Sequence, residues 1–398
     1  MSGRSLILHI GAPKCGSSAL QTALTRHPDL RDSAGRRLRY IALRQQNNGY
    51  HPVYGNMVQR RGAASVYGYM CWPNFGRHTD SGPILKAMQD VLHAGQRGGW
   101  VPVLSCEGWI NHPDLFAGAL ADLGHPQVDV VCFLRPPAEW VNAAWWQWGI
   151  WSVPSVDVWL NRGGLPYGFA DHLERWAAIP NLTLRVRRSR PDAVQKFNAL
   201  YGCHLGAQKA ENISSPASLL GFLLRNRAYR ETPHDARSEF IFQRWCPQVP
   251  GKRLWALAPR HIHKLRPVTR HSREVLQRLL PDADRKDLFD DPRWTSEDPY
   301  HDAIRSGISI LNDPADLPAL HAALVEGVVV ASAAAGQMVS DLPDPLRGTD
   351  PVTDWDPVLA EVFDRLIALD AQLRRTRVLG AAQGLKDRLH SAVSRLRG

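Results

Sequence analysis

Residues 6–21 read Leu6-Ile-Leu-His-Ile-Gly-Ala-Pro-Lys-Cys-Gly-Ser-Ser-Ala-Leu-Gln21. The apolar run from Leu6 to Ile10 has the length of a strand, and a loop bounded by two glycines follows it. From Ser17 onward, apolar residues recur at helical spacing, which predicts a helix. A strand, a glycine-bounded loop and a helix start in this order form an anion cradle, because backbone N–H groups and the positive helix end converge there.

The cradle loop differs from a Walker A loop, in which a lysine directly follows the second glycine. Here Ser17 follows Gly16, and Lys14 lies inside the loop. The pattern Gly-x-x-Lys-x-Gly-Ser-Ser resembles the 5′-phosphosulfate loop of the sulfotransferases that use PAPS, 3′-phosphoadenosine 5′-phosphosulfate, in its bacterial glycan or natural-product branch. The resemblance implies that PAPS is the cofactor, that Lys14 is catalytic, and that the loop residues bind the cofactor: Gly11, Ala12, Pro13, Lys14, Cys15, Gly16, Ser17 and Ser18. A strand–turn–helix whose glycines serve geometry alone is the other interpretation.

Composition sets the class of protein. The chain has 398 residues, 44% of them apolar, and a formal net charge of +10 without a long Lys/Arg block. This charge fits an anionic ligand or simply a basic surface, and no nucleic-acid arm stands out. The six cysteines form no Cys-x-x-Cys pair, so we expect reduced thiols and no metal site. The first apolar run is too short for a signal sequence, and we expect a cytoplasmic protein.

Strands and helices alternate along the chain. Apolar runs predict strands at 100–105, 128–134 and 182–187, with helical patterns between them. Such alternation indicates an α/β fold with a central parallel sheet. With the resemblance, we expect a P-loop-like three-layer fold over residues 1–290. It includes a loop-rich insert at 27–80, which is either an acceptor wall or a surface excursion that covers the sheet. Residues 291–398 are expected to form a helical C-terminal extension.

Ligands of such sheets lie beyond the carboxyl ends of the strands. Glu107 follows the strand at 100–105, where a carboxylate can take a proton from an acceptor hydroxyl. The resemblance implies that Glu107 is the catalytic base. His51 is the rival base, because other branches of the family use a histidine.

The strand at 128–134 is followed by Arg135-Pro-Pro-Ala-Glu-Trp-Val-Asn-Ala. The family's 3′-phosphate motif begins with an arginine at this place and carries a serine eight residues later. Arg135 matches, but position 143 is alanine, and the neighbouring Asn142 points about 100° away on a helix. Arg135 and Asn142 are therefore the candidate residues for the 3′-phosphate. A cluster of tryptophans follows, which suits either packing or an acceptor platform: Trp140, Trp145, Trp146, Trp148, Trp151 and Trp159.

The C-terminal part carries two helical patterns. Residues 357–377 have an apolar seam that suits another helix, either in this chain or in a second copy. Residues 371–398 hold seven Lys/Arg and one acidic residue, net +6, which is typical of a solvated terminal helix or of a peripheral contact with an anionic membrane.

The resemblance implies a sulfotransferase that moves a sulfuryl group from PAPS to a hydroxyl or amine of a carbohydrate or natural product. The alternatives are a nucleotide-binding module without turnover and a P-loop kinase-like phosphotransferase. The kinase predicts a lysine after the second glycine, which is absent here.

Overall fold

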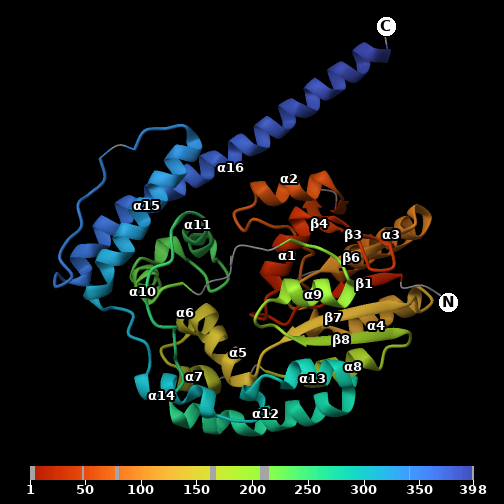
Figure 1. Ribbon diagram of the computed structural model, residues 1–398, viewed down its shortest axis with the longest axis horizontal. Coiled ribbons are helices and arrows are strands. Elements are labelled where there is room, and N and C mark those ends of the chain that lie inside the picture. The colour runs from red at the N-terminus through yellow and green to blue at the C-terminus, as the bar shows by residue number, and fades with distance from the viewer. Residues whose placement is uncertain are drawn as a thin grey trace. The chain divides into compact units, whose positions relative to one another are not determined.

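The computed structural model describes residues 5–46, 49–76, 80–161, 167–206, 215–339 and 341–396, with side chains as far as Thr376 (Figure 1). The chain divides into two compact units. We call the first the sheet unit; it comprises Met1–Gln59, Tyr69–Lys209 and Trp255–Ile308. We call the second the helical unit; it comprises Arg60–Gly68, Ala210–Leu254 and Ser309–Gly398.

The sheet unit is an α/β structure built on a six-stranded sheet in the order β2-β3-β6-β1-β7-β8. β1 lies in the middle and pairs in parallel with β6 and β7, while β2 alone in this sheet runs antiparallel to its neighbour. The predicted α/β class is confirmed, with a mostly parallel sheet. The strands of this sheet are β1 (Leu6–His9), β2 (Asp29–Arg31), β3 (Arg37–Tyr40), β6 (Trp100–Ser105), β7 (Val128–Leu134) and β8 (Leu182–Arg188).

The central strands form because their side chains are buried on both faces of the sheet. Every residue of β1 and β7 is buried, which is why both read as continuous apolar runs. Parallel pairing aligns His9 at the end of β1 with Ser105 at the end of β6. The segments after β1, β6 and β7 therefore start from one edge of the sheet.

Helices join and cover these strands (Figure 1). α1 packs with α9, and a second group forms where α8 packs with α4 and α12. The helices of the sheet unit are α1 (Ser17–Arg26), α3 (Ser81–Gly98), α4 (Pro113–Asp122), α5 (Pro137–Ala144), α6 (Ile150–Ser152), α7 (Val156–Asn161), α8 (Phe169–Ala177), α9 (Ala193–Tyr201), α12 (Pro259–Leu279), α13 (Asp282–Phe289) and α14 (His301–Ser306). α2 (Asn56–Ala64) begins in the sheet unit and ends in the helical unit.

The segment 27–80 is more regular than the predicted loop-rich insert. β2 and β3 extend the central sheet, because Leu38 and Tyr40 alternate into the core while β3 pairs with β6. β4 (Ala42–Gln46) and β5 (Gly49–Val53) form a separate antiparallel pair. The expectation of a mostly irregular insert was therefore wrong.

The helical unit contains α10 (Ala217–Arg225), α11 (Arg237–Trp245), α15 (Leu317–Ala335) and α16 (Val352–Leu396). This division differs from the boundary expected at residue 290. Residues 210–254 belong with the C-terminal helices because α11 packs on α15 and α16. Residues 291–308 belong with the sheet unit, where Trp255 contacts Tyr300 at a ring-centroid distance of 5.5 Å.

The apolar seam of α16 is used inside the chain. Leu359, Val362, Phe363 and Leu366 are fully buried, and α15 packs along α16. α15 therefore fills this part of the seam within the chain, and an oligomer through residues 357–377 stays a prediction. Among the described residues, one helical stretch, Pro314–Ala335, is long and apolar enough to cross a membrane, but half of its most apolar window is buried inside the protein.

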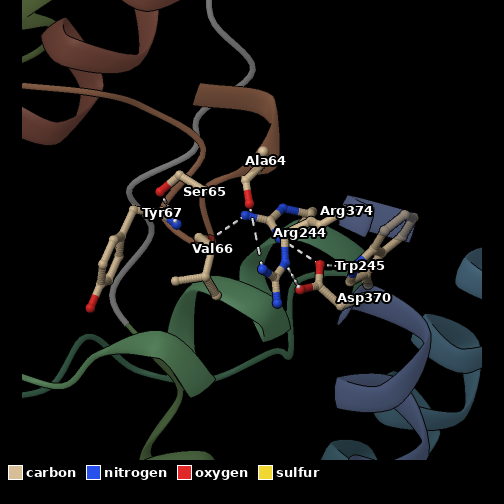
Figure 2. A network of polar contacts seen from close by, with 8 residues as sticks. All are labelled: Ala64, Ser65, Val66, Tyr67, Arg244, Trp245, Asp370 and Arg374. Atoms are coloured by element: carbon tan, nitrogen blue, oxygen red, sulfur yellow. Dashed lines mark hydrogen bonds and ion pairs between the residues drawn. The ribbon is translucent and has the colours of Figure 1, made fainter. Parts of the chain in front are cut away.

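A buried carboxylate ties the parts of the helical unit together, as Figure 2 shows. Asp370 on α16 is fully buried and pairs with Arg244 on α11. It also accepts from Trp245 Nε1 at 2.9 Å and from Arg374 Nε at 2.7 Å. Arg244 in turn donates to the backbone carbonyl of Val66. The short segment 60–68 thus belongs to the helical unit through an arginine held by a buried aspartate.

Candidate functional site

The loop between β1 and α1 has the backbone of an open cradle. Gly11 has φ +22°, Lys14 has φ +59° and Gly16 has φ +94°, so three of its residues lie in the left-handed region. Gly16 is the N-cap of α1 and no side chain caps this helix. The first turn also has no acidic residue, so no carboxylate of that turn offsets the positive end of α1.

Ser17 gives a sharper sign of a missing partner. Its side chain is 1% exposed, and its Oγ is a buried atom for which the described residues supply no hydrogen-bond partner. A Cβ on Gly11 would come within 2.7 Å of this Oγ, so only glycine leaves room beside the hydroxyl. Buried hydroxyls are normally paired, so this cradle fits a bound group that accepts from Ser17.

Lys14 is held from a helix far along the chain. Its Nζ donates to Gln147 Oε1 at 3.0 Å. Gln147 lies in a π-helical turn, Trp145–Gly149, directly after α5. Trp140 on α5 donates from Nε1 to the carbonyl of Pro13 at 2.7 Å. α5 and the π-turn therefore brace the loop, and π-helical turns are frequent at functional sites.

Glu107 is joined to the cradle by backbone hydrogen bonds on both sides. Cys106 N–H donates to His9 O at 3.1 Å, and Gly108 N–H donates to Gly11 O at 2.8 Å. Burial raises the pKa of the Glu107 carboxyl above its usual value, and the charge of Lys14 opposes the rise. The predicted base and the predicted lysine are therefore brought together at one strand edge.

A buried polar network lies at the ends of β1 and β6. Gln21 Nε2 donates to Ser105 Oγ at 3.1 Å, and Ser105 Oγ lies 2.7 Å from His9 Nδ1. Burial lowers the pKa of His9 to about 3, so the imidazole is neutral. This network fixes Ser105 two residues before Glu107. Sequence reasoning missed it, although polar residues within an apolar strand were a signal.

Arg135 follows β7, as expected, and faces the end of β8. Its Nε donates to Ser189 Oγ at 3.2 Å, and its carbonyl accepts from Tyr167 OH at 2.7 Å. Arg135 and Ser189 line a narrow crevice that is rich in arginine and also contains two carboxylates; its other lining residues are Leu134, Pro136, Glu139, Arg188, Arg190, Asp291 and Arg293. Ser189 was not predicted as a site residue, because its partner Arg135 lies 54 residues earlier in the sequence.

Cys15 lies within electrostatic reach of the predicted charged groups. Burial raises the pKa of the Cys15 thiol to about 12, Arg135 lowers it and Glu107 raises it, with Lys14 lowering it as well. The thiol is therefore protonated and unreactive. All six cysteines lie in the described part of the chain, and the structure gives none of them a disulfide partner there.

Two predicted residues have other surroundings. Asn142 is buried on α5, and its Oδ1 accepts from the backbone N–H of Ala256 at 2.9 Å, so it braces the segment before α12. His51 lies on β5 opposite Arg44, in the two-stranded sheet rather than at the end of a central strand. Most of the tryptophan cluster is buried, namely Trp140, Trp145, Trp146 and Trp151, while Trp148 and Trp159 are partly exposed.

No protein-family model matches the chain, and no curated protein or solved structure matches it significantly. Within the described residues, no group of three or more His, Cys, Asp or Glu side chains is placed to hold a metal ion.

Proposed function

We propose that the chain is a PAPS-dependent sulfotransferase with a P-loop-like, three-layer α/β fold and a helical C-terminal part, acting in the cytoplasm. It would transfer a sulfuryl group to a hydroxyl or amine of a carbohydrate or natural product and release PAP, the desulfated nucleotide. The observation that carries the proposal is the cradle. Its loop contains a helix start without a side-chain cap, a buried Ser17 hydroxyl that pairs with none of the described residues, and Lys14, and the loop is joined to the Glu107 segment.

The cradle residues suit the donor end of the reaction. PAPS supplies the sulfuryl group and a 5′-phosphate leaving group. The first N–H groups of α1 and the Ser17 hydroxyl would hold the anionic oxygens. During transfer, the Lys14 ammonium would leave the Gln147 amide and donate to the leaving 5′-phosphate oxygen, on which negative charge develops. Before transfer, the hydrogen bond to Gln147 would hold the ammonium close to that oxygen.

Glu107 suits the role of the base. Burial raises the pKa of the Glu107 carboxyl, so this carboxylate is a stronger base than an exposed glutamate. A stronger base takes the proton of the acceptor hydroxyl more readily. Its backbone tether to Gly11 fixes the base relative to the donor cradle. Positioning and charge neutralisation account for most of the catalysis in reactions of this kind.

Arg135 and Ser189 suit the second anionic group of the donor. Arg135 carries the charge, and Ser189 supplies a hydroxyl beside it at 3.2 Å. We propose that Ser189 takes over from the serine that position 143 lacks, since Ala143 has no polar side chain. The carboxylates of Glu139 and Asp291 are paired with Arg293 and so are partly neutralised.

Calorimetric titration with PAP, AMP and ATP tests the nucleotide class. We expect PAP to bind more tightly than AMP, because AMP lacks the 3′-phosphate, and Lys14→Ala to weaken PAP binding by tenfold or more. Lys86→Ala is the matched control, because Lys86 is 74% exposed. Preference for ATP in the presence of Mg²⁺ would favour the phosphotransferase instead.

Incubation with ³⁵S-labelled PAPS and a cell extract tests turnover. A labelled product formed by the wild type and not by Lys14→Ala would support transfer and would reveal the acceptor class. PAP binding without any labelled product would favour the binding module, for which Ala143 is the specific argument.

A further inference from the structure

A short stretch of the sheet unit lies against the segment after β6, which includes the proposed base. We call residues 72–75 the strap. Trp72 N–H donates to the carbonyl of Ser105, at the end of β6, at 3.0 Å. Trp109 Nε1 donates to the carbonyl of Pro73 at 3.0 Å. Two hydrogen bonds therefore hold the strap to residues on either side of the proposed base.

Trp72 and Phe75 anchor the two ends of the strap. Both side chains are buried. Trp72 Nε1 donates to the carbonyl of Ile41 at 2.7 Å. The Phe75 ring stacks on the Trp109 ring at a centroid distance of 6.1 Å. Asn74 lies between these anchors and is exposed, so its backbone is held while its side chain faces solvent.

The side-chain amide of Asn74 lies over Gly108, the residue after Glu107. A Cβ on Gly108 would come within 2.3 Å of Asn74 Nδ2 and 2.9 Å of Asn74 Cγ, so any side chain there would displace the amide. Asn74 Oδ1 accepts from the N–H of Phe75 at 2.9 Å, which assigns the two ends of the amide. Within the described residues nothing accepts from Nδ2, and its two hydrogens are available at an exposed position.

The Glu107 carboxyl lies within electrostatic reach of the strap. Burial raises the pKa of Cys71, the residue before the strap, to about 12, and the charge of Glu107 adds to this rise. The charge of Lys14 opposes the rise in the pKa of Glu107 itself. The N–H of Gly108 donates to the cradle loop at 2.8 Å. The donor hydrogens of Asn74 therefore lie beside both the proposed base and the cradle.

We propose that Asn74 selects a carbohydrate acceptor, because its Nδ2 donates to an oxygen on the carbon next to the hydroxyl that receives the sulfuryl group. This inference rests on the proposed function and names the class of the acceptor. In the transfer, the acceptor oxygen forms the new bond to sulfur, and the bond between sulfur and the 5′-phosphate oxygen of PAPS breaks. The acceptor proton moves to Glu107, and PAP leaves with the electron pair of the broken bond.

The donor character of the Asn74 amide distinguishes carbohydrates from acceptors with an isolated hydroxyl. In a sugar ring, a neighbouring hydroxyl places an oxygen beside the reacting one, and this oxygen can accept from Nδ2. A phenol or another hydrophobic natural product would place C–H groups there and would separate the amide from water. A site that pairs with a hydroxyl discriminates against a ligand without it, because the polar group of the site is then left unpaired.

Sulfuryl transfer from ³⁵S-labelled PAPS to trans-cyclohexane-1,2-diol and to cyclohexanol tests this inference, because the two acceptors differ only in the second hydroxyl. For the wild type we expect kcat/KM per hydroxyl to be about three- to tenfold higher for the diol, as one hydrogen bond would give. Asn74→Ala should bring this ratio close to one, mainly by raising KM for the diol, and should leave PAP affinity unchanged. Asn74→Asp keeps the shape of the side chain and the acceptor for Phe75 N–H but removes the donor hydrogens, so the ratio should fall in the same way.

Asn56→Ala is the matched control, because Asn56 is an exposed asparagine of the same unit, at the start of α2. It should keep the wild-type ratio. A wild-type ratio of one, an unchanged ratio in Asn74→Ala, or PAP binding without any sulfation of the diol overturns the inference and leaves the donor site in place. A wild type that binds no PAP in calorimetry, before any acceptor is added, overturns the proposed function and the inference with it.

Discussion

Gly11→Ala is the sharpest test of the cradle geometry. An added Cβ would lie 2.7 Å from Ser17 Oγ, 3.0 Å from Cys106 O and 3.1 Å from Glu107 Cα. Two of these three atoms belong to the segment that carries Glu107, and the third is the unpartnered hydroxyl. One methyl group therefore presses at once on the proposed anion site and on the segment of the proposed base.

The expected cost has two parts. A non-glycine residue at φ +22° costs about 1–2 kcal/mol in the left-handed region. Overpacking against backbone atoms adds about 1–3 kcal/mol. The free energy of unfolding should therefore fall by roughly 2–5 kcal/mol. Displacing the Ser17 hydroxyl removes a hydrogen bond to a charged ligand, worth about 1.5–3 kcal/mol, so PAP affinity should fall by about tenfold to a hundredfold.

Urea denaturation followed by tryptophan fluorescence measures the first effect, and calorimetric titration with PAP measures the second. Gly118→Ala is the control, because Gly118 lies inside α4 with open space where its Cβ would be. It should stabilise the protein by roughly 0.5–1 kcal/mol and leave PAP binding unchanged. A Gly11→Ala protein with the wild-type urea midpoint and wild-type PAP affinity would refute the described cradle.

Three further predictions concern polar side chains, one in the candidate site, one in the helical unit and one in the sheet. Glu107→Gln should lower the sulfuryl-transfer rate about 10²–10⁴-fold and leave PAP affinity unchanged. The wild-type rate should rise with pH through a pKa above that of an ordinary glutamate. An unchanged rate in the variant would exclude Glu107 as the base. Burial raises the pKa of Asp370, but Arg244, Trp245 and Arg374 outweigh it, so the pKa lies below its usual value. Its stabilising effect is thus present above the unfolded pKa of about 3.9 and is lost as pH falls through the lower folded value. In urea denaturation at neutral pH, Asp370→Asn should lower the free energy of unfolding by about 3 kcal/mol, and it should flatten this acid dependence. The control Asp302→Asn, at an exposed carboxylate, should change the free energy of unfolding by less than about 1 kcal/mol. Equal effects of the two variants would contradict the buried pairing. Ser105→Ala leaves buried partners unpaired and should cost about 1–3 kcal/mol, against almost nothing for exposed Ser152→Ala.

The central strands could be predicted because buried strands appear in the sequence as short runs of apolar residues. Trp100–Ser105 and Val128–Leu134 have the predicted bounds, since each is a mostly apolar run that ends at Ser105 or just before Arg135. β3 could not be predicted in this way. Arg37-Leu-Arg-Tyr40 is short and half basic, and it becomes a strand only through its pairing with β6 and the contact of Arg39 with the Trp100 ring.

The same distinction holds for the candidate site. Gly11, Lys14, Gly16 and Ser17 could be predicted from the sequence because a strand, a loop and a helix start are local features. Gln147 and Ser189 could not, since their partners Lys14 and Arg135 are separated from them by 133 and 54 residues. No local pattern encodes which helix returns to a loop, so these contacts depend on the packing of the whole sheet unit.

The helical unit is assembled from three stretches of chain, at 60–68, 210–254 and 309–398, with segments of the sheet unit between them. A module joined to an enzyme by one gene fusion would instead form a single uninterrupted block at one end. A chain that ended at residue 308 would lack Asp370, the ion-pair partner of Arg244. Its segments 60–68 and 210–254 would also lack the C-terminal helices with which they form the helical unit. The helical unit therefore cannot be taken from the gene as one continuous piece, and a chimaeric protein built on it would have to include the intervening segments of the sheet unit.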